Sequence, residues 1–446
     1  MPSFSTWRSR FASILVSSIC TPSIAAVVFS IGTPSIARRH KSQSTSIPKK
    51  LQRVRDHGFD DLMEVEKKVR RVLKLQDLIL THPGGGLPVS RLDTLARRHL
   101  GFAPQEAGSF ILRHPHVFHI FDHPVQRILW IRLTPRAVHQ IRLESDAISS
   151  SLPAAAHRLR RLLLLAAPSF RIRLEHIRLA RRDLGLPDDF EQSVVLANPS
   201  LFRLLSPSGP DAEPRLKFVE AVVDPDEPSP VAAVDLARER EYRARGSDAE
   251  DARFAFPIQF PPGFKIGKYY RIAVWKWQRL PYWSPYEDVS GYDLRSLEAQ
   301  RRMEKRAVGS IHELLSLTAE KRTALEKIAH FRQAMGLPKK LKEFLLQHQG
   351  IFYISTRGNQ GKLHTVFLRE AYRKGELLEP NDVFLARKRL RELLLMSPKK
   401  VNFDRMLTSL GRGVNSKQFF EDGDVGRGED GDGSGSDSGV ETQIVD

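Results

Sequence analysis

The sequence predicts an α+β fold that is mainly α and is built from tandem three-helix-plus-β-hairpin modules. The main observation is a pattern that occurs three times along the chain, beginning at Leu95, Leu179 and Ile328. A second short, strand-like run follows each copy, as expected for a hairpin. With 446 residues, 41% of them hydrophobic, the chain is long enough for two or three domains with sizeable cores.

The first helix of each copy is amphipathic and ends at a glycine. These glycines are Gly101, Gly185 and Gly336. A proline follows shortly after each glycine, at Pro104, Pro187 and Pro338. Glycine just past a helix and proline at the start of the next are the usual signals of a helix boundary. A second helix then stops near Pro115, Pro199 and Gly350.

An aromatic-containing strand follows the second helix of each copy, through Phe118, Phe202 and Phe352. Its expected partner strands read RILWIRL, RLKFVEA and HTVFLRE. Another helix precedes each copy and is clearest at residues 62–80, where apolar residues recur at helical spacing. The order helix, helix, helix, hairpin resembles a winged helix-turn-helix module, and this analogy rests on element order alone.

Both ends of the chain differ in composition from its body. Residues 1–50 contain seven basic and no acidic residues and are rich in Ser and Thr, which predicts an organelle transit peptide. A long uncharged run leaves a membrane anchor or a secretory signal as alternatives, but Pro22 and Pro34 interrupt it. Residues 406–446 are expected to form a disordered tail, with nine acidic residues from Glu421 onwards.

Between these ends we expect two folded parts joined by a linker. Residues 51–223 hold the first two modules, and residues 224–250 form the linker. Residues 251–405 hold an aromatic segment and the third module. The aromatic segment contains the run YYRIAVWKW, which is compatible with either a strand or the start of a helix.

The chain is strongly basic. It has 70 Lys and Arg against 52 Asp and Glu, a net charge of +18 at pH 7. This excess predicts a polyanionic partner, with a merely solvated basic surface as the alternative. The single cysteine, Cys20, excludes an intramolecular disulfide and a cysteine-based zinc site, and it fits a reducing compartment.

Arginine is concentrated in the first two modules. Residues 91–182 contain sixteen Arg, no Lys and six acidic residues. Arginine binds phosphate in a bidentate manner and stacks on bases, whereas lysine acts as a point charge. The competing interpretation is a helix surface solvated by guanidinium groups. The candidate RNA-binding residues are Arg97, Arg98, Arg181 and Arg182 at matching repeat positions, Arg158, Arg160 and Arg161 on one helix, and Arg171, Arg173 and Arg178 on the next.

Trp275 and Trp277 complete the candidate set. They lie where aromatic and basic residues interleave, so they could stack on unpaired bases if they are exposed. Such residues more often belong to a core, and here they would seal an interface between modules. Core packing is the interpretation we expect for at least one of the two.

No residue pattern predicts catalysis or a cofactor. His114, His116, His119 and His123 are close in sequence, but strand alternation divides them between two faces and no carboxylate partner is evident. The segment HPGGGLPVS lacks the Lys-Ser/Thr of a phosphate-binding loop. We therefore expect no catalytic residue, no metal, no cofactor and no small-molecule substrate.

Five long segments of the body carry a family resemblance: RDHGFDDLMEVEKKVRRVLKLQDLIL, HPHVFHIFDHPVQRILWIRLT, RIRLEHIRLARRDLGLPDDF, LPYWSPYEDVSGYDLRSLEAQRRMEKRAVGSIHELLSLT and GIFYISTRGNQGKLHTVFLREAY. They extend over about residues 55–400. On these segments the chain resembles the plant organelle RNA recognition (PORR) domain proteins, of the "what's this factor" group of organellar splicing factors. The resemblance implies organelle import, RNA binding and group II intron splicing alongside other nuclear-encoded splicing factors. It implies no catalytic residues, and it carries over no individual RNA-contacting side chain.

The expected function is therefore to bind organellar intron RNA and to favour its active fold, with no membrane partner. Early arginines at Arg8 and Arg10 favour the mitochondrion, with the chloroplast as the alternative. Two other functions stay open. One is a structural or assembly protein of the organellar ribosome, and the other is a nucleic-acid-processing enzyme.

Overall fold

The computed structural model describes residues 55–397, apart from 104–105, 207–215, 225, 245–255, 262, 265–266 and 358–363. These residues form mainly α-helices with small antiparallel sheets, which confirms the predicted α+β class. The predicted transit peptide and acidic tail lie outside the described residues. Within the described part, every helix is too short or too polar to cross a membrane.

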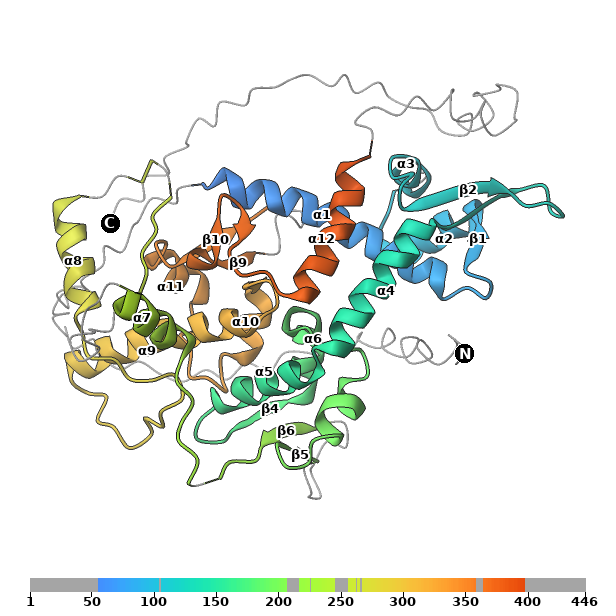
Figure 1. Cartoon of the computed structure of the whole chain (residues 1–446). Coiled ribbons are helices and arrows are strands. Elements are labelled where there is room, and N and C mark those ends of the chain that lie inside the picture. Colours follow the sequence, from blue (N-terminus) through green and yellow to red (C-terminus); the bar gives the residue numbers. More distant parts are fainter. Residues whose placement is uncertain are drawn as a thin grey trace, which may run out of the picture.

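The first module begins with a long helix and ends with a hairpin (Figure 1). Its elements are α1 (His57–Leu80), β1 (Gly86–Pro88), α2 (Val89–Leu100), α3 (Glu106–Leu112), β2 (Phe118–Asp122) and β3 (Leu129–Leu133). Strand β3 lies between β1 and β2 in an antiparallel sheet. The predicted helix at residues 62–80 and the predicted hairpin are therefore both present.

The second and third modules repeat this order of elements. The second consists of α5 (Leu152–Leu164), β4 (Arg171–Arg173), α6 (Leu174–Leu184), η2 (Glu191–Leu196, a π-helix), β5 (Phe202–Leu205) and β6 (Phe218–Ala221). The third consists of α9 (Leu297–Leu317), β7 (Arg322–Ala324), α10 (Leu325–Phe331), α11 (Leu341–Gln347), β8 (Phe352–Ser355) and β9 (Thr365–Leu368). Their strand orders, β4-β6-β5 and β7-β9-β8, match that of the first module. The winged-helix likeness beyond this order stays a prediction.

The glycine positions explain where the repeated helices end. Gly101 and Gly185 follow α2 and α6 directly, and both have a left-handed backbone with a φ of 68°. Only glycine adopts this conformation without steric cost, so the chain reverses there. The short first strand of each sheet was not predicted, because three residues are too few to show a period of two.

Among the described residues, four further helices join the modules. They are α4 (Pro135–Ser150), α7 (Ala233–Ala244), α8 (Lys268–Gln278) and α12 (Asp382–Leu395). Helix α7 lies within the expected linker, and the ambiguous YYRIAVWKW run is part of helix α8. The 3-10 turn η4 (Arg369–Ala371) leads into the small hairpin of β10 (Tyr372–Arg373) and β11 (Glu376–Leu377).

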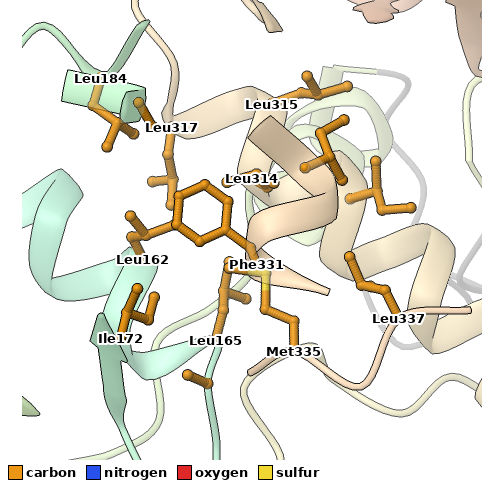
Figure 2. Packing of buried hydrophobic residues seen from close by; sticks show 14 of the residues in the cluster. Leu162, Leu165, Ile172, Leu184, Leu314, Leu315, Leu317, Phe331, Met335 and Leu337 are labelled. Carbon is orange, nitrogen blue, oxygen red and sulfur yellow. The ribbon is translucent and has the colours of Figure 1, made fainter. Parts of the chain in front are cut away.

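The second and third modules share one hydrophobic core. Phe331 of α10 lies at its centre, facing Leu162 of α5 and Leu314 of α9 (Figure 2). Ile172 of β4 and Leu184 of α6 complete the contact from the second module. Burying these side chains removes apolar surface from water, at about 25 cal/mol per Å², so the two modules stabilise each other.

The first module has its own core, and α12 connects this core to the rest of the protein. Leu390 and Leu394 of α12 pack with Val72 and Leu75 of α1. Asn381 caps α12 by accepting a hydrogen bond at 2.8 Å from the backbone N–H of Phe384. The helix therefore begins beside the third module and ends in the core of the first.

A cluster of buried charges lies where all three modules meet. We call it the central charge cluster, and it consists of Glu66, Glu144, Glu320, Arg322, Arg387 and Arg391. Glu320 accepts hydrogen bonds from Arg322 and, at 2.6 Å, from Arg391. Arg322 also binds Glu66 of α1 at 2.8 Å.

Arg387 of α12 extends the central charge cluster to the second module. Its Nε lies 2.9 Å from Glu144 of α4, and its Nη2 donates at 2.9 Å to the carbonyl oxygen of Arg182 on α6. Burial alone would raise the pKa of Glu320, but Arg322, Arg391 and Arg387 outweigh it and hold this pKa well below its usual range. The carboxylate is therefore ionised at neutral pH and is shared by three guanidinium groups, of which Arg322 also pairs with Glu66 and Arg387 with Glu144.

Replacing Glu320 with Gln should strongly destabilise the protein. The variant leaves three buried guanidinium groups short of one negative charge, which typically costs about 3–5 kcal/mol of unfolding free energy. Glu376→Gln is the matched control, because Glu376 pairs with Lys388 at the surface and should change stability by less than about 0.5 kcal/mol. Urea unfolding of both variants measures the difference. Equal midpoints for the two would contradict the organising role of the cluster.

Candidate nucleic-acid interface

The three-stranded sheets of the three modules pair their strands in the same register. Each of these sheets therefore has an equivalent outer face. Residues that pair directly lie on the same side of a sheet, and their neighbours point to the core. The outer faces consist of Gly86, Pro88, His119, Phe121, Trp130 and Arg132 in the first module, of Arg171, Arg173, Arg203, Leu205, Phe218 and Glu220 in the second, and of Arg322, Ala324, Tyr353, Ser355, Thr365 and Phe367 in the third.

The outer face of the third sheet is buried under helix α1. Phe59 of α1 stacks on Tyr353 with ring centroids 5.0 Å apart and packs against Phe367 at 4.9 Å. The hydroxyl of Tyr353 donates a hydrogen bond at 2.9 Å to Asp60. Arg322, on the same face, belongs to the central charge cluster. This face therefore holds the first module in place and is closed to ligands.

The outer face of the second sheet carries exposed arginines. Arg171 and Arg173 lie on strand β4, which corrects the prediction that placed them on a helix with Arg178. The guanidinium of Arg171 lies over the ring of Phe218, at 5.7 Å from its centroid. Because three-residue strands show no periodicity, no sequence pattern indicates that these arginines belong to a sheet. They lie on an exposed edge strand, where a phosphate can approach them.

Three of the candidate arginines, Arg158, Arg160 and Arg161, form hydrogen bonds with other residues of the protein. Arg158 donates from Nε to the carbonyl oxygen of Leu184 at 3.2 Å. Arg160 binds Glu227 through both terminal nitrogens, one of them at 2.7 Å. These contacts connect α5 to neighbouring segments, so both side chains have structural partners.

Arg161 is bound even more extensively than its two neighbours. Its Nη2 lies 2.7 Å from Glu313 and donates at 2.7 Å to the carbonyl oxygen of Val231, and its Nε donates to Tyr286 at 3.0 Å. Burial opposes the charge of Arg161, but Glu313 outweighs it and raises the pKa of the guanidinium. This arginine ties α5 to α9 and to the segment before α7.

The arginines at matching repeat positions lie in the last turns of α2 and α6, as predicted. Arg97 pairs with Asp93 at 3.1 Å, and Arg98 is exposed. On α6, Arg181 pairs with Asp188 at 2.9 Å and Arg182 lies 3.6 Å from Glu144. Cations favour the C-terminal end of a helix dipole, which accounts for part of this placement without any ligand.

Arg178 also has intramolecular partners. Its Nε lies 2.7 Å from Glu191 of η2, and its Nη1 lies 3.3 Å from Glu175. The pairs are partly exposed, and surface pairs of this kind contribute about 0–1 kcal/mol, so RNA phosphates could replace the carboxylates. Of the ten candidate arginines, Arg98, Arg171 and Arg173 are exposed and form no ion pair with a carboxylate of the described residues.

The two candidate tryptophans differ in their surroundings. Trp277 is buried, stacks on Phe256 at 5.7 Å and lies 5.0 Å from the ring of His348. Trp275, two residues earlier on α8, is 52% exposed and lies under the guanidinium of Arg279, 3.4 Å from its ring centroid. Trp277 is therefore a core residue, whereas Trp275 presents a ring and a cation at the surface.

Two of the four clustered histidines, His114 and His123, make separate local contacts. His114 is buried against Phe110, its Nδ1 lies 3.0 Å from the hydroxyl of Ser397, and burial lowers its pKa to about 4. His123 accepts backbone hydrogen bonds within the hairpin turn through Nδ1. The described residues contain no group of three or more side chains arranged to hold a metal ion.

The outer face of the first sheet is the feature that sequence reasoning missed. His119 and Phe121 alternate along β2 on this face, and Trp130 and Arg132 oppose them on β3. By sequence alone, the histidines suggest only possible metal ligands. Alternation of aromatic and basic residues on both strands was the signal that could have identified a shared surface.

A sequence model of the plant organelle RNA recognition domain matches residues 54–399. The chain belongs to the plant organelle RNA recognition (PORR) family. Its match spans all three modules and α12, so the family unit includes the whole described structure. No solved structure matches the chain.

The chain is similar to several curated plant proteins. The chain is 61% identical over 381 residues to the protein ROOT PRIMORDIUM DEFECTIVE 1 of Arabidopsis thaliana, covering 85% of this chain and 92% of the relative. It is 32% identical over 350 residues to the chloroplastic WHAT'S THIS FACTOR 1 homolog of Oryza sativa subsp. japonica, covering 77% of this chain and 65% of that protein. It is 28% identical over 346 residues to the mitochondrial WHAT'S THIS FACTOR 9 of Arabidopsis thaliana, covering 76% and 84%.

Replacing each of the two tryptophans of α8 with alanine should change the stability of the protein by very different amounts. Trp277→Ala should lower the free energy of unfolding by about 3–5 kcal/mol, because it removes a buried ring and leaves a cavity. Trp275→Ala should change stability by less than about 1 kcal/mol, because half of its surface already faces water. Thermal unfolding by circular dichroism compares them. A larger loss for Trp275→Ala would show that α8 packs differently.

Proposed function

We propose that this protein is an RNA-binding factor that promotes group II intron splicing in a plant organelle. It binds intron RNA and favours the active RNA fold over misfolded alternatives, and it has no catalytic role of its own. The observation that carries the proposal is membership of the PORR family across residues 54–399. The names of the relatives, which place some in the chloroplast and one in the mitochondrion, support an organellar location.

The structure supports RNA binding through its charge. The chain has a net charge of +18, and the exposed arginines include Arg98 on α2 and Arg171 and Arg173 on β4. Lys and Arg contacts to phosphates release counterions, so they supply much of the affinity for nucleic acid. Because these arginines lie on rigid helices and strands, a folded intron can meet them in one fixed geometry.

Mitochondria are the proposed location. The support is the composition of residues 1–50, with seven basic and no acidic residues. The chain is proposed to work there with other nuclear-encoded splicing factors and organellar intron RNA.

The proposal is tested by RNA co-immunoprecipitation of the tagged full-length chain from purified mitochondria and chloroplasts of the same plants. We expect a group II intron transcript to be enriched from the mitochondrial fraction, and the enrichment to persist after ribosomes are dissociated. A test variant has Arg98, Arg171 and Arg173 changed to Gln. It should recover less intron RNA than the wild type when equal amounts of protein are captured.

Other outcomes would replace the proposal. Recovery of ribosomal RNA with ribosomal subunits, without introns, would make the protein a component of the organellar ribosome. Enrichment from chloroplasts would correct the location alone. Cleavage of RNA by the purified chain in the presence of divalent cations would identify a nuclease instead.

A further inference from the structure

The outer face of the first sheet carries an ordered group of rings. We call His119, Phe121, His123, Trp130 and Arg132 the ring platform. His119 and Phe121 stack with centroids 5.8 Å apart and planes 20° from parallel. His123 and Trp130 lie 4.7 Å apart at 34°. Phe121 and Trp130 are direct partners across the two strands, so both ring pairs belong to one surface.

Local hydrogen bonds hold these rings in place. The backbone N–H groups of Val125 and Gln126 donate to Nδ1 of His123, and the indole N–H of Trp130 donates to the side chain of Gln126 at 3.1 Å. The guanidinium of Arg132 donates to His119 at 3.3 Å and lies over Phe121, 4.9 Å from its centroid. The platform therefore presents ordered rings together with a cation.

The ring platform is not part of the protein core. The opposite face of the same strands supplies the core of the first module, through Leu87, Phe118 and Ile131. On the platform side, His119 and Arg132 are exposed, and Phe121 and Trp130 are partly exposed. Figure 1 shows the β2–β3 hairpin extending away from the body of the protein. Folding of the module therefore does not account for the rings.

Comparison of the three sheets shows that the platform lacks a β1 side chain beside Arg132. At the position of β1 that pairs with Arg132, the first module has Gly86. The equivalent positions are Arg171 in the second module and Arg322 in the third, where α1 covers the whole face. A Cβ at Gly86 would lie 3.7 Å from the indole ring of Trp130. This is an ordinary van der Waals distance, and the nearer neighbour of that Cβ would be the carbonyl oxygen of Ile131, at 3.0 Å. The glycine therefore leaves this position beside Arg132 without a side chain.

The surrounding charge identifies the kind of ligand that fits the platform. Residues 82–142 contain eight Arg, no Lys and three carboxylates. A polyanion that also offers flat aromatic surfaces complements both the charge and the rings. An RNA strand with unpaired bases has both properties, whereas a duplex hides the faces of its bases.

We propose that the ring platform of the first module stacks unpaired bases of RNA, while Arg132 contacts the adjoining phosphate. The proposal rests on the RNA-binding function proposed above and specifies where single-stranded segments bind. Every base has an aromatic face, so the platform tolerates different sequences and selects unpaired over paired RNA. The first module then recognises exposed loops of a folded transcript, and the arginines of the second module contact its backbone.

The test measures binding of the full-length chain to an unstructured RNA oligonucleotide and to the duplex of the same sequence, over a range of salt concentrations. Phe121→Ala and Trp130→Ala should each weaken single-strand binding by roughly 5- to 150-fold with an unchanged salt slope, because a stack and not a charge is lost. Arg132→Gln should lower the slope by about 0.7. Duplex binding should stay near that of the wild type for both ring variants.

Two controls separate stacking from damage to the fold. Val125→Ala changes an 83% exposed residue at the tip of the same hairpin and should bind both RNAs like the wild type. Trp130→Phe keeps an aromatic ring, so it should retain most of the affinity for single-stranded RNA. RNA binding should quench the tryptophan fluorescence of the wild type, and this variant should lose the part of the quenching that comes from Trp130. Trp275→Phe, on α8, should keep that quenching. Thermal unfolding confirms that each variant is folded.

The outcomes distinguish the two proposals. If the wild type binds single strands and the folded Phe121→Ala and Trp130→Ala variants bind equally well, the platform does not contact RNA and the proposed site is wrong. If the ring variants lose single-strand and duplex binding in parallel, the platform does not select unpaired bases. If the wild type binds neither RNA, the proposed function itself is wrong.

Discussion

Glu320 occupies the position on which the arrangement of the three modules depends. Its carboxylate meets Arg322 on the same module and Arg387 and Arg391 on α12, and Arg322 continues to Glu66 on α1. Buried charges are tolerated only when they are paired and hydrogen-bonded. The relative position of α1, α12 and β7 is therefore set by electrostatics as well as by packing. Apolar contacts alone are less directional and would permit several placements of the first module.

This constraint gives three copies of one module three different surfaces. The outer face of the third sheet is covered by α1, so its aromatic residues Tyr353 and Phe367 stabilise the assembly. The second sheet keeps Arg171 and Arg173 at its surface, and the first keeps the ring platform. The outer face of one sheet therefore has a structural role, whereas the outer faces of the other two sheets are exposed. The exposed faces differ in chemistry, since one is rich in cations and the other in rings.

Sequence reasoning identified the repeat, the hairpins and the helix-ending glycines, because glycine and proline punctuate the chain at the same place each time. It missed the three-residue strands, and with them the sheet positions of Arg171 and Gly86. It also selected Arg160 and Arg161 by residue type, although long-range partners such as Glu227 and Glu313 bind them. Pairing across 67 or 152 residues leaves no local pattern in the sequence.

Taken together, the two proposals place RNA on the outer faces of the first two sheets. Ultraviolet cross-linking of the full-length chain to intron RNA, followed by mass spectrometry of the attached peptides, tests this most directly. We expect cross-links within residues 118–133 of the first module and on β4, β5 or β6 of the second. Cross-links confined to α8 and the third module, with none on these two sheets, would contradict it.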